Sequence, residues 1–264
     1  MVLSDLVENY PALRSIGGAE LSQHFLDHAQ DFTGDPLSAQ DLRGIDIIVA
    51  AGSTLALVQY VTLQMKGSDA ICICFLGDAA NNQGTFHESL NMAKLWNLPV
   101  LYVCENNLYG IGTRIDRSTA VVDQYKRVSG YNIPSAQEDG QDVELVHKAA
   151  VKAIRHVRDG KGPYFLELMT YRYRGHSMSD SNAYRAKAEE RMWSKRDPVI
   201  MLRDRLIDAG KLTTEEFRDM DTEILDEIEN EIIAYAEESP EPDAAGVALY
   251  TLAENDPWVR GGVS

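Results

Sequence analysis

The sequence has few cysteines, no long apolar run and no surplus of basic residues. Three of its 264 residues are cysteines, an odd number that cannot form a disulfide framework, and we therefore expect free thiols in a reducing compartment. The longest apolar run, residues 70–76, is far shorter than the roughly 20 residues that cross a bilayer. The 25 basic residues against 41 acidic ones leave a formal charge of −16, which argues against nucleic acid or an anionic membrane as the main partner.

The first ten residues also lack the features of a targeting segment. They show neither the charged-then-apolar layout of a secretory signal nor the Arg-rich, acid-poor bias of a transit peptide. We therefore expect a cytoplasmic protein, or one in the mitochondrial matrix if the source is a eukaryote and the presequence is absent from this chain.

The apolar pattern between residues 70 and 169 predicts an α/β fold. Residues 70–76 and 99–104 are short continuous apolar runs, which are typical of strands that are buried on both faces. A helix predicted over 82–96 separates them, and a strand, a helix and a strand of these lengths form a right-handed unit with parallel strands. A further helix, with Val146, Ala150 and Ile154 on one face, precedes a third strand at 164–169. The sequence therefore predicts a parallel sheet flanked by helices.

The C-terminal third changes character. From 170 to 196 the hydrophobic period disappears, which predicts a long loop of the kind that is often functional. A helix is predicted from Asp197 to Gly210, and a capping box of Thr213 and Glu216 opens a second one. Residues 213–243 hold 13 acidic residues and one basic residue, and we interpret them as a solvated helix face. The apolar positions of the second helix, which we expect to face inward, are Ile224, Ile228 and Ile232.

Two polar residues follow neighbouring strands. Asp78 comes directly after the first strand and Asn107 after the second, so both are expected at the carboxyl edge of the sheet, where ligands bind in open α/β folds. Carboxylate and amide oxygens suit Mg²⁺. Residues 79–82 then open a helix, whose first N–H groups suit a diphosphate. The pattern predicts a cation site beside an anion site.

These motifs resemble those of a known family. Gly77-Asp78 followed by Asn106-Asn107 resembles the thiamine diphosphate motif. Residues 81–113 are similar to the α subunits of the 2-oxo-acid dehydrogenases, and residues 170–180, TYRYRGHSMSD, are most similar to the pyruvate dehydrogenase α subunits. The resemblance runs from about residue 69 to residue 261. It implies a single thiamine-diphosphate-binding domain over 1–264, in four segments: a divergent N-terminal segment 1–44, the core 45–170, an active-site loop 171–196 and C-terminal helices 197–264.

The resemblance also implies roles for particular residues. The implied Mg²⁺ ligands are Asp78, the side chain of Asn107 and the backbone carbonyl of Tyr109. The backbone of Gly77, Ala79 and Ala80 would face the diphosphate, and the backbone of Val49 would contact the aminopyrimidine ring. The implied residues on the loop are Arg172 and His176, which would touch the diphosphate and border the substrate channel, with His176 as the catalytic residue.

The implied activity is oxidative decarboxylation of pyruvate with acetyl transfer to a lipoyl group. The implied partners are a β subunit in an α2β2 assembly and the lipoyl-bearing acyltransferase of the complex. The glutamate that activates the cofactor belongs, in this family, to the β subunit. Alternatives within the class are the α subunits of acetoin and branched-chain 2-oxo-acid dehydrogenases.

The sequence departs from the family pattern in two places. Ala79 stands where the motif has its second glycine, and residues 45–54 lack most of the glycines that are usual before the first strand. The N-terminal Tyr-Arg diphosphate clamp of the family has no match in residues 1–44. These departures favour a second alternative, a non-catalytic relative that assembles with a β subunit but holds the cofactor poorly.

Overall fold

A computed structural model describes residues 71–241 of the chain. Val49, the segment 1–44 and the residues after 241 lie outside the described part. The chain divides into two compact units, Met1–Leu202 and Arg203–Ser264, which are described separately. No helix in the described range is long and apolar enough to cross a membrane.

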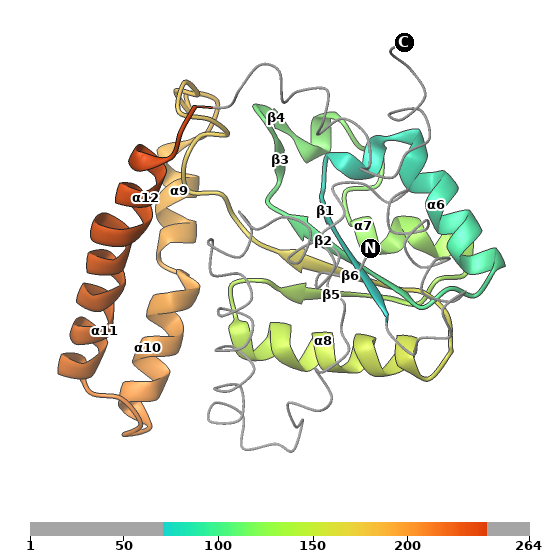
Figure 1. Cartoon of the computed structure of the whole chain (residues 1–264). Coiled ribbons are helices and arrows are strands. Elements are labelled where there is room, and N and C mark those ends of the chain that lie inside the picture. Colours follow the sequence, from blue (N-terminus) through green and yellow to red (C-terminus); the bar gives the residue numbers. More distant parts are fainter. Residues whose placement is uncertain (1–70, 242–264) are drawn as a thin grey trace, which may run out of the picture. The chain divides into compact units, whose positions relative to one another are not determined.

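The first unit contains a parallel sheet of four strands (Figure 1). In spatial order these are β1 (Cys72–Gly77), β2 (Val100–Asn106), β6 (Tyr164–Met169) and β5 (Ser135–Asp139). The α/β prediction is thus confirmed, and β6 has the predicted bounds. The sequence analysis missed β5, because its residues are polar and half-buried and offer no apolar run.

Two helices cover opposite faces of this sheet. Helix α6 (Gly84–Leu95) links β1 to β2, and α8 (Val143–Arg158) links β5 to β6. The two connections run in opposite directions along the sheet, so right-handed crossovers place their helices on opposite faces. Two separate hydrophobic clusters result, one around Phe86 and Leu90 of α6 and one around Ala153 and Val157 of α8.

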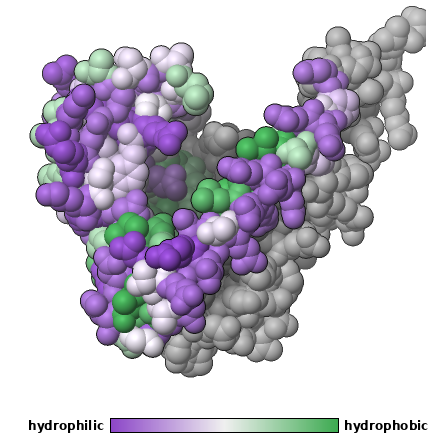
Figure 2. All heavy atoms as spheres, turned by 90° about the vertical axis from the view of Figure 1, so that its left-hand side faces the viewer, coloured by the Kyte–Doolittle hydropathy of each residue, from purple (hydrophilic) through white to green (hydrophobic). Residues whose placement is uncertain are grey.

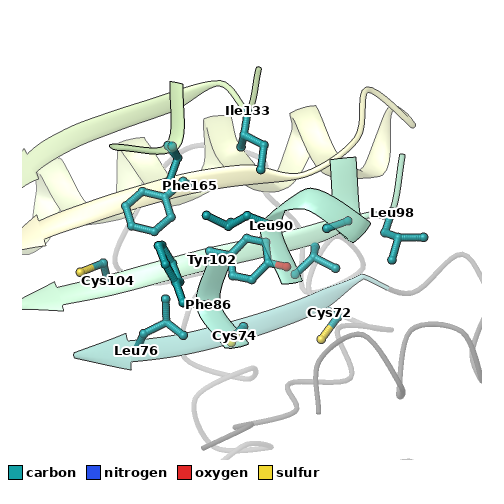
Figure 3. Packing of buried hydrophobic residues seen from close by; sticks show 13 residues of the cluster. Cys72, Cys74, Leu76, Phe86, Leu90, Leu98, Tyr102, Cys104, Ile133 and Phe165 are labelled. Atoms are coloured by element: carbon teal, nitrogen blue, oxygen red, sulfur yellow. The ribbon is translucent and has the colours of Figure 1, made fainter. Parts of the chain in front are cut away.

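The cluster beneath α6 includes all three cysteines (Figure 3). The rings of Phe86 and Phe165 meet edge to face, with 6.1 Å between their centroids. The cysteines are free and buried, and burial raises the pKa of the Cys72 and Cys74 thiols to about 12. They act as small hydrophobic residues, as the sequence predicts.

Short elements connect the main ones. A 3₁₀ turn, η1 (Ala80–Asn82), precedes α6, so the predicted helix begins two residues later than expected. A small hairpin of β3 (Tyr109–Gly110) and β4 (Thr113–Arg114) follows β2. The connection continues through three short helices: η2 (Ile115–Arg117), α7 (Gln124–Arg127) and η3 (Val128–Tyr131).

The predicted loop over 170–196 is shorter than expected. Its last part forms a helix, α9 (Lys187–Ser194), whose Trp193 is buried and stacks on Tyr171 with 5.3 Å between ring centroids. The prediction failed here because the helix has few apolar residues, and Trp193 alone is buried against the loop.

Helix α10 (Pro198–Asp208) begins after Asp197, whose carboxylate caps it, and ends before Gly210, which has a φ of +67°. In the second unit, α11 (Thr214–Glu227) opens with the predicted capping box and continues through the π-helical turn η4 (Ile228–Ile232) into α12 (Ile233–Glu238).

The apolar stripe of the second unit is exposed. Ile224, Ile228 and Ile232 were expected to face inward, yet they are 52%, 39% and 54% exposed. Helical spacing identifies a stripe without identifying a neighbour that covers it, which is why this prediction is wrong. The acidic residues of the same helices are exposed, as predicted. Figure 2 shows a mainly hydrophilic face that is interrupted by smaller hydrophobic areas.

Candidate active site

The turns after β1 and β2 bring Asp78 and Asn107 together. Gly77 pairs with Glu105 in the sheet, so the two strands end at the same level. Asp78 is only 2% exposed, and its carboxylate accepts the backbone N–H groups of Asp78 and Asn107. Burial raises the pKa of Asp78, while these two hydrogen bonds and the charge of Arg172 lower it to a smaller extent. A buried carboxylate with a raised pKa is stabilised by a nearby cation.

The β3–β4 hairpin packs closely against the turn after β1. A Cβ atom on Gly110 would lie 2.6 Å from the Cβ of Ala79, so a glycine is required at this approach. The side chain of Tyr109, on the same hairpin, is buried, and its hydroxyl donates to Glu189 of α9 at 2.9 Å. The hairpin thus places the backbone of Tyr109 close to the turn that carries Asp78.

The backbone around Asp78 is accessible from outside. Gly77 and Ala79 are exposed and Ala80 is half-buried. Space is open around Gly77, since no atom lies within 4 Å of a Cβ built on it. Ala79 is the N-cap residue of η1, with helical φ and ψ. These residues are therefore reachable by a ligand at the carboxyl edge, with the Ala79 methyl group as an added obstacle.

Arg172 and His176 lie on the loop that follows β6. Arg172 donates to the carbonyl of Ile111 in the hairpin at 2.8 Å and to the Tyr184 hydroxyl at 3.1 Å. Its guanidinium also lies 3.4 Å from Nδ1 of the exposed His176. The structure therefore brings this loop to the turns that carry Asp78 and Asn107. Sheet order explains the meeting, because β6 lies next to β2 and parallel to it, so the carboxyl ends of the two strands are adjacent.

Two residues that the sequence analysis missed hold the loop. Arg185 is 6% exposed, lies over the rings of Tyr109, Tyr171 and Tyr184 at 5.0–5.6 Å, and donates to the carbonyls of Arg172 and Arg174. Asp180 accepts the backbone N–H of His176 and the Tyr184 hydroxyl, each at 2.7 Å. These hydrogen bonds, with one from the Asn182 N–H, lower the pKa of Asp180 to about 2. Arg185 carries no signal in the sequence, because loop contacts have no period. Asp180 is the last residue of the motif over 170–180, but the resemblance implied no role for it.

Glu167 is the third residue that was missed. It is a fully buried carboxylate in β6, within hydrogen-bond distance of four donors from other segments. One signal was available: an acid inside an otherwise apolar strand requires an internal partner.

The oxygen atoms at this edge fit a hard divalent cation. They include the buried Asp78 carboxylate, the Asn107 amide oxygen, which accepts the Tyr109 N–H at 3.0 Å, and the hairpin backbone. No group of three or more His, Cys, Asp or Glu side chains that could hold a metal occurs among residues 71–241. A cation here would therefore depend on amide and carbonyl oxygens and on ligand phosphate, which is the pattern that Mg²⁺ tolerates.

Comparison with known proteins gives a consistent result. The sequence pattern of the family described as dehydrogenase E1 component matches residues 24–245. The chain is similar to the pyruvate dehydrogenase E1 component subunit alpha of Rhizobium meliloti (strain 1021), with 44% identity over 204 residues, 77% of this chain and 57% of the relative. It is also similar to the testis-specific mitochondrial form of Homo sapiens, with 41% identity over 223 residues, 81% of this chain and 57% of the relative.

A third relative is the somatic mitochondrial form of Rattus norvegicus, with 38% identity over 237 residues, 89% of this chain and 57% of the relative. The chain therefore spans less than two thirds of the length of these relatives.

Proposed function

Because the chain belongs to the dehydrogenase E1 component family, we propose that it is the α subunit of a pyruvate dehydrogenase. In this role it takes part in the oxidative decarboxylation of pyruvate and in acetyl transfer to a lipoyl group. The observation that carries the proposal is the convergence of Asp78, Asn107, Arg172 and His176 at one sheet edge. The names of the three relatives, all pyruvate dehydrogenase E1 component subunits alpha, support pyruvate as the substrate.

The proposed cation ligands are Asp78, the Asn107 side chain and the Tyr109 carbonyl, which together hold Mg²⁺. The backbone of Gly77, Ala79 and Ala80 faces a diphosphate. When bound, thiamine diphosphate supplies the nucleophilic carbon and the electron sink for decarboxylation of a 2-oxo acid. Val49, outside the described residues, is proposed to contact the aminopyrimidine ring through its backbone.

The loop residues have a different proposed task. Arg172 supplies a positive charge toward the diphosphate, and His176 borders the substrate channel as the proposed catalytic residue. The imidazole of His176 can donate or accept a hydrogen bond at a substrate oxygen. The loop as a whole excludes water from the reacting carbon.

The proposed assembly is an α2β2 heterotetramer in which the β subunit supplies the activating carboxylate. The lipoyl-bearing acyltransferase receives the acetyl group. The mitochondrial and bacterial relatives are consistent with the cytoplasm or the mitochondrial matrix as the compartment. The acetoin and branched-chain alternatives, and a non-catalytic relative, gain no support from the names of the three relatives.

The deciding experiment is titration calorimetry of thiamine diphosphate with Mg²⁺ into the co-expressed α and β chains. Asp78→Ala is expected to weaken binding more than 100-fold, since this carboxylate is the single charged protein ligand in the proposed set. Asp159→Ala, at the exposed end of α8, is the matched control and is expected to leave affinity unchanged.

Two results would contradict the proposal. Binding that survives Asp78→Ala within a few-fold would remove Asp78 from the cation site. Decarboxylation of pyruvate by the purified chain without a β subunit would contradict the division of labour between the subunits.

A further inference from the structure

A buried carboxylate lies behind the candidate cation site without belonging to it. Glu167 of β6 is fully buried, at 0% exposure. Burying an ionised carboxylate is costly unless hydrogen bonds replace the lost water. Glu167 has such replacement from four donors, so its position is fixed by several segments at once.

The four donors come from three segments. They are Nδ2 of Asn106 at 2.6 Å, the backbone N–H groups of Gln124 at 3.2 Å and Tyr125 at 3.0 Å, and Nε2 of Gln137 at 3.0 Å. The sequence separations range from 30 to 61 residues. Glu167 therefore joins the end of β2, the start of α7 and strand β5.

The contact with Asn106 controls the turn that carries the proposed ligands. Asn106 donates to Glu167, and its Oδ1 accepts the Leu108 N–H at 3.0 Å. The backbone carbonyl of Asn106 accepts the Thr170 N–H at 2.9 Å, so both the side chain and the backbone of Asn106 are fixed by hydrogen bonds. Leu108 has a φ of +72°, an unfavourable value for a residue with a Cβ. The Asn106–Leu108 hydrogen bond stabilises this conformation, which directs Asn107 and Tyr109.

The contact with α7 links Glu167 to the turn after β1. Asp123, the N-cap residue of α7, makes no side-chain cap bond, and the Glu167 carboxylate accepts the first N–H groups instead. Arg127, at the end of α7, donates to the carbonyl of Asn81 at 3.0 Å. Asn81 lies in η1, directly after the turn that contains Asp78 and Ala79. One carboxylate thus connects to the turns after β1 and β2.

We infer that Glu167 is a positioning residue: it fixes the turn over residues 106–109 and thereby orients the Asn107 amide and the Tyr109 carbonyl toward the cation. The inference rests on the proposed function for the identity of the cation. Glu167 makes no hydrogen bond to Asp78, Asn107 or Tyr109, so its positioning effect runs through Asn106, although its charge also helps to raise the pKa of Asp78. Outer residues that orient metal ligands typically change metal affinity 10- to 100-fold when they are replaced.

The test uses the full chain co-expressed with its β subunit. Glu167→Gln keeps the size of the side chain but replaces one acceptor oxygen with an NH₂ donor, which faces N–H groups. At a fixed thiamine diphosphate concentration, the half-saturating Mg²⁺ concentration measured by calorimetry is expected to rise about 10- to 100-fold. Glu138→Gln, the same change on the neighbouring strand, is the matched control and is expected to leave this concentration unchanged.

A second readout needs no cofactor. Hydrogen–deuterium exchange of a peptide covering residues 105–112 reports the Leu108 and Tyr109 amides in the cofactor-free assembly. Exchange there is expected to speed up in Glu167→Gln and to stay the same in Glu138→Gln. If Glu167→Gln does not fold, Asn106→Ala removes the link to the turn while leaving the other three donors of Glu167, and the same two effects are expected.

The outcomes separate the two proposals. Unchanged Mg²⁺ affinity in a folded variant, with binding intact in the wild type, overturns the role of Glu167 while the proposed function stands. A wild-type assembly that takes up no thiamine diphosphate with Mg²⁺ overturns the proposed function. In that case unchanged exchange of the 105–112 peptide still overturns the role of Glu167, and faster exchange supports it as the residue that fixes the turn.

Discussion

The two halves of the candidate site are held in different ways. The turn after β2 is fixed by the buried carboxylate of Glu167, and the hairpin that follows it packs directly on Ala79 in the turn after β1. The loop after β6 is anchored from within by Arg185 and by an exposed network around Asp180. The proposed cation ligands thus lie on turns fixed by the sheet core, whereas Arg172 and His176 lie on a loop fixed mainly by its own side chains, and the loop is the part whose local opening we expect to be easier.

The largest effect is expected from the loop. Arg185→Met removes a cation that lies over three tyrosine rings and donates to two carbonyls, at an expected cost of about 2–4 kcal/mol in local stability. Limited proteolysis and hydrogen exchange of residues 172–186 measure this opening. Arg191→Met on α9, where the arginine is exposed, is the control. Equal protection in both variants would contradict the anchoring role of Arg185.

The next effect tests packing of the hairpin. Gly110→Ala places a Cβ 2.6 Å from that of Ala79, and relief of this clash is expected to cost about 1–3 kcal/mol in the free energy of unfolding. The double variant Ala79→Gly/Gly110→Ala removes the opposing methyl group and is expected to recover most of that loss. Urea unfolding measures both variants, with Gly130→Ala in open space as control. Additive losses in the double variant would show that the two residues do not meet.

A smaller effect separates binding from stability at Ala79. Ala79→Gly alone is expected to tighten thiamine diphosphate binding several-fold in the αβ assembly, because glycine lets the backbone approach a phosphate. It is also expected to lower stability by about 1 kcal/mol or less. Calorimetry and the melting temperature of the cofactor-free form measure the two opposite effects. A stability loss without any gain in affinity would argue that no phosphate lies there and would favour the non-catalytic alternative.

The smallest effect concerns pH. The hydrogen bonds to Asp180 hold its pKa at about 2, below the value of about 3.9 for an unfolded chain. The carboxylate therefore stabilises the loop fully above pH 4, and this contribution is lost as the pH falls from about 4 towards 2. Asp180→Asn is expected to lower the melting temperature at pH 7 by about 2 °C or less. The difference from the wild type should shrink at pH 3, and a constant difference would contradict the assignment.

The sequence predicted the parts of the fold that depend on local patterns. Strands β1 and β2 contain continuous apolar runs, and Asp78 and Asn107 follow them, so both the strands and the candidate residues were found. Strand β5 was missed because it is defined by long-range pairing with β6, and its polar residues form no local apolar pattern. The partners of Glu167 are 30 to 61 residues away, and no local pattern encodes them. The apolar stripe of Ile224, Ile228 and Ile232 was recognised from helical spacing, but the spacing does not indicate which element, if any, covers the stripe, and the three residues are exposed.

The order of strands in the sheet has a consequence for synthesis of the chain. Among the four sheet strands within residues 71–241, β6 is synthesised last, 58 residues after β2 ends at Asn106, yet it lies between β2 and β5. At about 5–20 residues per second, translation leaves the edge of β2 without its neighbour for roughly 3–12 s. During this time the hydrogen bonds from Asn106 and from the start of α7 to the carboxylate of Glu167 cannot form. During this interval the edge of β2 that later pairs with β6 is open, and its free backbone groups can pair with another strand.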